Sequence, residues 1–211
     1  MSRKLLFTFV AAGLLIVCCA PLLVAAGEEK SPETAGAAPA ASQGSSEAEM
    51  MDAMMKAATP GEPHSRMKSM AGSWTMSVKS YFGPGEPKVS EGTCEAATIL
   101  GDRYIKEECK GDFGGMPYQG MGIYGYDNLK KKYVSAWVDN MGTGIMLSQG
   151  TWDAKKKTFT YRSTEMDPLT LKNEPVKMVI KVDSEDSHTA SFYGWKNGKD
   201  VLQMEITYTR K

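Results

Sequence analysis

The stretch QGMGIYGYDNLKKKYVSAWVDNMGT, residues 119–143, decides the fold of this chain. Residues 121–126 and 133–138 are rich in Tyr, Ile, Val and Trp, which suit a pleated and half-buried surface, and a polar, lysine-rich segment separates them. This pattern predicts a β-hairpin in which Gly122 lies opposite Trp137. A glycine at that position leaves room for the indole ring to lie flat on the neighbouring backbone.

The two-residue period of side chains along a strand divides this hairpin into two faces. Aromatic and polar residues form the first face: Tyr124, Tyr126, Tyr133, Trp137 and Asp139. Aliphatic residues form the second: Met121, Ile123, Val134, Ala136 and Val138. Both faces are apolar enough to be buried, so the hairpin alone does not say which one points inward.

Segments on both sides of the hairpin repeat its pattern, with short turns between them and no convincing helix. The expected strands are residues 74–81, 89–100, 103–111, 118–126, 132–139, 144–152, 158–165, 175–182, 188–195 and 201–210. The sequence therefore predicts an all-β fold, an antiparallel up-and-down β-barrel of about ten strands, with a short N-terminal helical turn at residues 65–70 closing one end.

Two residues at opposite ends of this array are expected to close the barrel. Alternation places Trp74 inward in the first strand and Arg210 inward in the last. A guanidinium group stacked on the indole, with its remaining donors on backbone carbonyls, would seal that end.

Cys94 and Cys109 are expected to form a disulfide. A turn at Gly101-Asp102 places them directly opposite one another on adjacent strands, within disulfide reach. A pair of reduced buried thiols and a redox-active pair are the alternatives.

Residues 1–26 read as a signal peptide, with a basic start, an apolar run and small residues before Gly27, so the protein is expected to be exported to the periplasm or beyond. An uncleaved anchor and a lipid attached through Cys18 or Cys19 are the alternatives. Without this segment the chain carries 23 basic and 25 acidic residues, and no concentrated basic stripe that would suit nucleic acid. No stable membrane insertion is expected after cleavage, and the oligomeric state is open.

Residues 27–63 are expected to be a disordered linker that contains one short helix over residues 47–58, and residues 64–211 the barrel domain. Methionines at helical spacing and a following histidine suggest an alternative function, in which the exported protein handles copper, because thioether and imidazole groups bind Cu(I). The residues are Met50, Met51, Met54, Met55 and His64, and two further methionines, Met67 and Met70, follow them in the sequence. Packing of a methionine stripe on the barrel or on a partner explains them as well.

Gly72-x-Trp74, together with Arg210 in the last strand, resembles the structural signature of the calycins, the lipocalin and fatty-acid-binding-protein barrels. A second resemblance, over residues 64–211, is to the bacterial domain-of-unknown-function family numbered fifteen seventy-nine. It rests on His64-x-x-Met67-x-x-Met70-Ala71-Gly72-x-Trp74, Glu91-Gly92-Thr93, Leu100-Gly101-x-Arg103, Gly120-x-Gly122, Gly125-Tyr126-Asp127, Lys132-Tyr133, Trp137-x-Asp139, Met141-Gly142-Thr143 and residues 205–210. These resemblances imply a lipocalin-like barrel in an exported bacterial protein, and no activity.

No catalytic constellation is visible: the chain has two histidines, His64 and His188, which excludes a multi-histidine metal centre, and a catalytic triad would have to use one of them. No cofactor is expected. His188 is interpreted as a turn-adjacent residue with local hydrogen bonds, with an axial haem ligand as the alternative.

The sequence favours a non-catalytic barrel that binds a small apolar or aromatic ligand, with Trp137, Tyr124 and Tyr126 as its lining and Asp139 at the rim. Glu107 is predicted to point inward, as a polar anchor for a ligand or, preferably, as a carboxylate in water at the barrel mouth. A hydrolase or isomerase that uses Glu107 or Asp139 is a further possible function, and a structural or partner-binding module is another.

Overall fold

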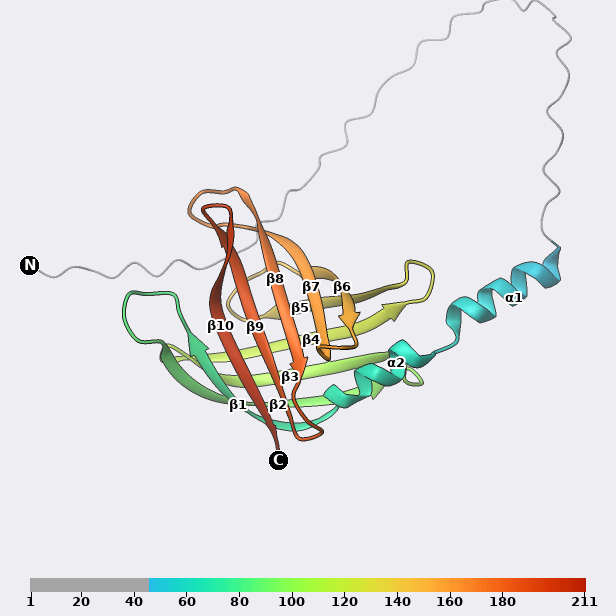
Figure 1. Ribbon diagram of the computed structural model, residues 1–211, viewed down its shortest axis with the longest axis horizontal. Helices are drawn as coiled ribbons and strands as arrows, with labels where there is room; N and C mark the ends of the chain where they lie inside the picture. The colour runs from blue at the N-terminus through green and yellow to red at the C-terminus, as the bar shows by residue number, and fades with distance from the viewer. Residues whose placement is uncertain (1–45) are drawn as a thin grey trace, which may run out of the picture. The chain divides into compact units, whose positions relative to one another are not determined.

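The computed structural model describes residues 46–211, which form three short helical segments followed by ten strands (Figure 1). The predictions for the signal peptide, the anchor, the lipid attachment and most of the linker lie outside these residues. The chain divides into two compact units, and residues 59–211 belong to the unit that holds the barrel. Within the described part of the chain, no helix is both long and apolar enough to cross a membrane.

The barrel is closed and antiparallel, and each strand pairs with its neighbours in the sequence until β10 pairs with β1. This confirms the predicted up-and-down barrel, and every strand boundary lies within two residues of the predicted one. The strands are β1 Gly72–Ser80, β2 Lys88–Ile99, β3 Tyr104–Phe113, β4 Met116–Asp127, β5 Lys132–Asp139, β6 Met146–Asp153, β7 Thr158–Met166, β8 Asn173–Val182, β9 Ser187–Lys196 and β10 Lys199–Arg210.

The hairpin of β4 and β5 has the predicted register, including Gly122 opposite Trp137. The structure also assigns its faces. Tyr124 and Tyr133 are buried, whereas Met121 and Ile123 are exposed, so the aromatic face points into the barrel and the aliphatic face points outward. Burying an aromatic side chain contributes more than burying an aliphatic one, because more apolar surface leaves water.

A short helical plug covers one end of the barrel, as predicted. It consists of α2, Glu62–Met67, and a single 3₁₀ turn, η1, Lys68–Met70. Pro63 suits the first turn of α2 because its missing N–H would have no partner there. Met67 and Met70 are buried in the core, and the Trp74 indole N–H donates to the Met70 carbonyl at 3.0 Å.

Arg210 closes the same end, which confirms the predicted contact with Trp74. Its guanidinium carbon lies 4.2 Å from the centroid of the Trp74 ring. The guanidinium donates to the Ala71 carbonyl at 3.1 Å and to the Glu185 carbonyl at 2.7 Å. One group therefore fastens the plug, the first strand and the turn between β8 and β9 to each other.

Aromatic rings fill the half of the barrel next to the plug. Tyr133 packs edge-on against Tyr126 and Phe159, with ring centroids 4.9 and 5.0 Å apart, and Trp152 lies 4.5 Å from Phe159. Towards the other end, inward-facing side chains such as Trp137 are only half-buried. Solvent therefore reaches the inner face of the wall from the end opposite the plug.

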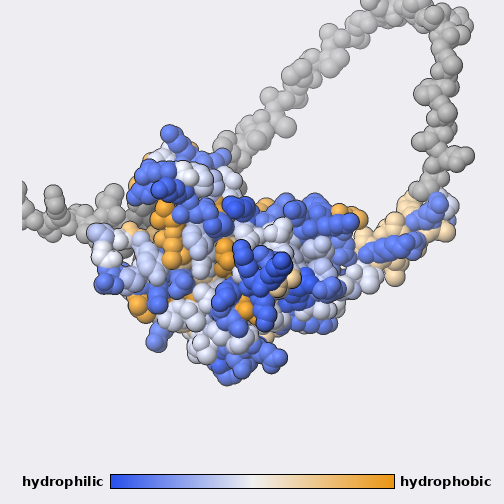
Figure 2. All heavy atoms as spheres, in the orientation of Figure 1, coloured by the Kyte–Doolittle hydropathy of each residue, from blue (hydrophilic) through white to orange (hydrophobic). Residues whose placement is uncertain are grey.

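The first helix, α1, Glu47–Ala58, has the predicted bounds and has no buried residue. Its four methionines are exposed, and apolar and charged side chains alternate on its surface in Figure 2. The predicted amphipathic helix is thus present, and its apolar stripe is uncovered.

Candidate functional site

The candidate site lies at the middle of the inner wall and is centred on Glu107 of β3. Glu107 has the inward parity of its neighbours Ile105 and Cys109, both of which are buried. Its partners across the sheet are Ala96 on β2 and Gly122 on β4. Both partners are small, so the carboxyl group has room to lean over either neighbouring strand.

The Glu107 carboxyl group lies against a disulfide. Cys94 and Cys109 are bonded, which confirms the predicted bridge. Oε1 of Glu107 lies 3.1 Å from Sγ of Cys94 and 3.6 Å from Sγ of Cys109. Disulfide sulfur carries no proton, so a hydrogen bond across this contact requires the protonated carboxyl group of Glu107 as its donor.

Burial raises the pKa of Glu107 to about 7, and a hydrogen bond donated by the Tyr124 hydroxyl offsets this only in part. The preferred interpretation of Glu107 as a solvated carboxylate at the barrel mouth is therefore wrong. The carboxyl group is buried together with Cys94 and Cys109. The sequence placed it on the correct face but could not show how deep in the barrel it lies.

Tyrosine hydroxyls from β4, β7 and β10 surround Glu107. Burial is the main cause that raises the pKa values of these hydroxyls, and nearby polar groups, Glu107 among them, add to it, so all of them stay protonated and can donate hydrogen bonds: Tyr118, Tyr124, Tyr161 and Tyr208. The Tyr161 side chain is fully buried, and its hydroxyl has no hydrogen-bond partner in the described part of the chain. A buried hydroxyl without a partner costs about 1 to 3 kcal/mol. The site is therefore polar and incompletely satisfied.

Trp137 forms the side of the site that faces the open end. A Cβ atom on Gly122 would come within 2.6 Å of the Trp137 ring, so the indole lies directly on this glycine, as predicted. The indole N–H donates to Oδ2 of Asp139 at 3.1 Å, and the Tyr118 hydroxyl lies 3.5 Å from the same oxygen. Asp139 thus fixes the orientation of the indole ring.

The structure brings four of the five predicted lining residues together and separates the fifth. Glu107 on β3 and Trp137 on β5 are the two cross-strand partners of Gly122, Tyr124 lies two residues after Gly122 on β4, and Asp139 two residues after Trp137 on β5. Tyr126 instead packs at the plugged end, where its ring centroid lies 5.8 Å from that of His64.

Sequence reasoning missed the tyrosines that approach Glu107 from other strands. Tyr161 alternates with the exposed Arg162 along β7, and Tyr118 shares the parity of Tyr124, so the sequence carries a signal for their inward positions. Their convergence on Glu107 depends on the curvature of the barrel, which parity does not show.

Both histidines contribute to packing. The His188 ring stacks on Tyr208 at 4.3 Å and meets Trp74 edge-on at 4.5 Å, which replaces the predicted local hydrogen bonding. Burial lowers the pKa of His188 to about 4, so the ring is neutral. His64 accepts a hydrogen bond from the Gly61 N–H at Nδ1, at 3.0 Å, and so supports the start of α2.

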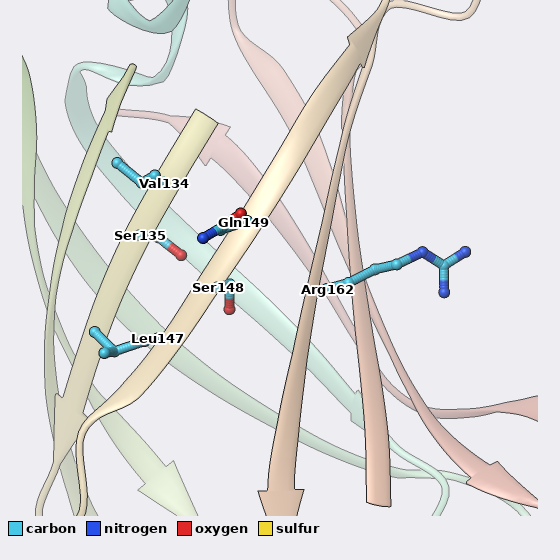
Figure 3. Close-up of a pocket in the computed structure, with 6 residues that line it drawn as sticks. All are labelled: Val134, Ser135, Leu147, Ser148, Gln149 and Arg162. Atoms are coloured by element: carbon cyan, nitrogen blue, oxygen red, sulfur yellow. The ribbon is translucent and has the colours of Figure 1, made fainter. Parts of the chain in front are cut away.

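A pocket of about 440 Å³ lies on β5, β6 and β7, away from Glu107 (Figure 3). It coincides with the end of the β6–β7 ladder, which starts only at the pair Gln149 and Arg162. Figure 3 shows Arg162 pointing away from the other lining residues. Inward-facing Ser135 and Ser148 and outward-facing Leu147 contribute to the lining of this pocket. Its lining contains no carboxylate, histidine or cysteine.

Comparisons with known proteins support the family and add no activity. The model of a family described as a protein of unknown function, DUF1579, matches residues 59–210. A search of curated proteins finds no match. Among solved structures, a redesigned beta barrel is 14% identical, with a TM-score of 0.38, over 69% of this chain and 95% of that chain.

Proposed function

The chain belongs to the DUF1579 family of proteins of unknown function, and we propose that its barrel binds a small organic molecule between Trp137 and the cluster around Glu107. The observation that carries this proposal is the Tyr161 hydroxyl, which is buried and has no hydrogen-bond partner among the described residues. A ligand group that bonded to this hydroxyl would remove its desolvation cost. Half-buried aromatic walls with a few convergent polar groups are typical of small-molecule sites.

The two halves of the barrel support this assignment in different ways. The plugged half is densely packed with aromatic rings and holds the inner wall rigid. In the other half, Trp137 and Tyr118 are only half-buried, so a ligand from solvent can reach them. Because the packed half holds the accessible half in place, few side chains need to become ordered when a ligand binds, so binding costs less conformational entropy.

Export is part of the proposal. It is supported by the basic and apolar pattern of residues 1–26, and by a disulfide between Cys94 and Cys109, because such bonds persist mainly in oxidising compartments. Copper handling stays a weaker alternative, because Met67 and Met70 are buried in the core and Nδ1 of His64 already accepts a hydrogen bond.

The test is native mass spectrometry of the protein purified from its own exported fraction, compared with the variants Trp137→Ala and Tyr161→Phe. We expect a retained small molecule on the natural protein and a reduced bound fraction on both variants. Tyr104→Phe, which removes a hydroxyl from an outward-facing position of β3, is the matched control and should keep the ligand. Equal retention by all four proteins would contradict the proposed site.

A second candidate function, acid–base catalysis, is favoured by one observation. A carboxyl group with a pKa of about 7 can both give and take a proton at neutral pH, and Glu107 has this property beside the Tyr124 hydroxyl. Catalysis would show as turnover of the retained molecule with a pH dependence centred near 7 that Glu107→Gln abolishes. Binding without turnover at any pH would leave the protein a binder.

A further inference from the structure

The part of the inner wall that β3 to β8 form carries acidic side chains and no cationic ones. On the six strands from β3 to β8, positions with inward parity include no Lys, Arg or His, and include four acids: Glu107, Asp139, Glu165 and Glu174. Glu165 and Glu174 are direct partners across β7 and β8, and burial raises the pKa of Glu165. Like charges placed opposite each other destabilise a sheet, so this arrangement favours a cation from outside the protein.

Aromatic side chains lie beside two of these acids, Glu107 and Asp139. Glu107 and Trp137 lie on either side of Gly122, which has no side chain to separate them. The Tyr124 ring lies within 3.1 Å of a Cβ position on the same glycine, and its centroid lies 6.0 Å from that of Tyr161. The faces of such rings attract ammonium groups, most strongly where water is excluded.

We propose that the ligand of this barrel is an organic cation, an amine or quaternary ammonium with an apolar or aromatic body, whose charge is held by Glu107 among the rings of Tyr124, Tyr161 and Trp137. This inference rests on the proposed function of the barrel as a small-molecule binder. The apolar body of the ligand lies towards Trp137 and the open end, and the Tyr161 hydroxyl accepts a hydrogen bond from an N–H of the ligand when one is present. In the empty protein, the buried carboxyl group of Glu107 is satisfied by taking up a proton.

The same arrangement makes binding depend on pH. The groups that face Glu107 are the disulfide of Cys94 and Cys109, and the hydroxyls of Tyr118, Tyr124, Tyr161 and Tyr208, none of which changes its charge between pH 6 and 8. Glu107 does change its charge there, because its pKa is about 7. Only the ionised form holds an ammonium group well, so the apparent affinity follows the ionised fraction and rises about tenfold from pH 6 to pH 8.

The test compares 2-phenylethylamine, which stays protonated over this range, with the uncharged 2-phenylethanol, by calorimetry and tryptophan fluorescence on the full chain. We expect the amine to bind at least about tenfold tighter than the alcohol at pH 8, and to lose about tenfold in affinity at pH 6. Glu107→Gln should abolish both the preference and the pH dependence. The matched control is Glu108→Gln, on the outward face of the same strand, which should bind like the natural protein.

Tyr161→Phe provides a second variant that does not depend on the folding of the Glu107 substitution. It should weaken binding of the amine about three- to tenfold, because it removes the acceptor for the N–H of the ligand. Equal binding of amine and alcohol would overturn the inference while leaving the proposed binding function standing. Amine preference that survives in Glu107→Gln would also overturn it, and failure of both probes to bind would count against the inference and the proposed function together.

Discussion

A single carboxyl group, that of Glu107, gives the interior of this barrel its chemical character. Its folded-state pKa of about 7 exceeds the value of 4.5 expected in the unfolded chain. Between these two pH values the folded protein holds a proton that the unfolded chain has released. The contribution of Glu107 to stability is therefore fully present below pH 4.5 and is lost as the pH rises through 7.

We expect the free energy of unfolding of the natural protein, relative to Glu107→Gln, to fall by about 3 kcal/mol between pH 4.5 and pH 8. Urea denaturation of both proteins across this range measures the difference and cancels the titration of His188, which both retain. Glu108→Gln, whose carboxylate is exposed, should show no such trend. A difference between natural protein and Glu107→Gln that does not vary with pH would mean that the carboxyl group is solvated.

Gly122 is the second residue on which the site depends. A Cβ atom there would meet the Trp137 ring at 2.6 Å and the Tyr124 ring at 3.1 Å. Gly122→Ala should therefore displace the indole, cost about 1 to 3 kcal/mol and shift the tryptophan emission. Gly83→Ala, where an added Cβ atom has open space around it, is the control for a glycine substitution as such. Equal effects of the two substitutions on stability and emission would exclude direct contact between Gly122 and the indole.

Residue-level prediction succeeded where local rules apply. The pairing of Gly122 with Trp137 and of Cys94 with Cys109 followed from counting residues outward from a turn, because antiparallel register is fixed by the turn. The burial of Glu107 did not follow, since it depends on side chains contributed by strands far away in the sequence, such as Tyr161.

At the scale of elements, the plug and the last strand form one unit of structure. Arg210 donates to carbonyls from the plug and from the β8–β9 turn while it stacks on Trp74. The predicted closure required only alternation in β1 and β10, because the two strands are neighbours when an up-and-down barrel closes. The carbonyls that accept from Arg210 belong to Ala71, directly after the plug, and to Glu185 in the β8–β9 turn. Alternation along a strand says nothing about where the carbonyls of such irregular segments point.

Substitution of Arg210 tests this closure. Arg210→Met should cost about 2 to 3 kcal/mol, because it leaves the carbonyls of Ala71 and Glu185 without their charged donor and removes the guanidinium from the buried Trp74 ring. Arg210→Lys should recover part of this loss, since a lysine keeps the charge but cannot reach both carbonyls with one planar group. Lys211→Met is the neighbouring control, because Lys211 only makes an exposed ion pair with Glu95, and it should change stability by less than about 0.5 kcal/mol. Urea denaturation measures the free energy of unfolding of each variant. If Lys211→Met lost as much stability as Arg210→Met, the role of Arg210 in closing the barrel would be contradicted.

At the scale of the whole molecule, the core residues of the barrel that the structure describes all follow Thr59 in the sequence. α1 has no buried residue, and the barrel lies in a separate compact unit. We therefore expect residues 59–211 to fold without the rest of the chain, with a melting temperature within about 2 °C of that of residues 27–211. Calorimetry of the two proteins measures this. Loss of a cooperative transition in the shorter protein would show that earlier residues belong to the fold.

The global fold was predictable for a physical reason. Alternating strands with short turns leave few topologies besides a meander that closes on itself, and Trp74 and Arg210 identified the closing pair. The division of the interior into a packed half and an accessible half was not predictable. It arises because the plug buries Met67 and Met70 at one end only, and the inward parity of strand residues is the same at both ends.

The closure of the barrel also has a consequence for how the chain reaches its native state. Each pair of consecutive strands can form as a local hairpin without reference to the rest, but β1 and β10 join residues as distant as Thr75 and Thr209, which are 134 positions apart. Such a contact is slow to form because a long loop must close first. Until it does, the meander is an open sheet whose two outer strands have unpaired backbone groups, and each can pair with the outer strand of another molecule. Crowding of newly made chains therefore competes directly with the last step of folding, and the plug with Arg210 decides that competition by holding the two edges together within one molecule.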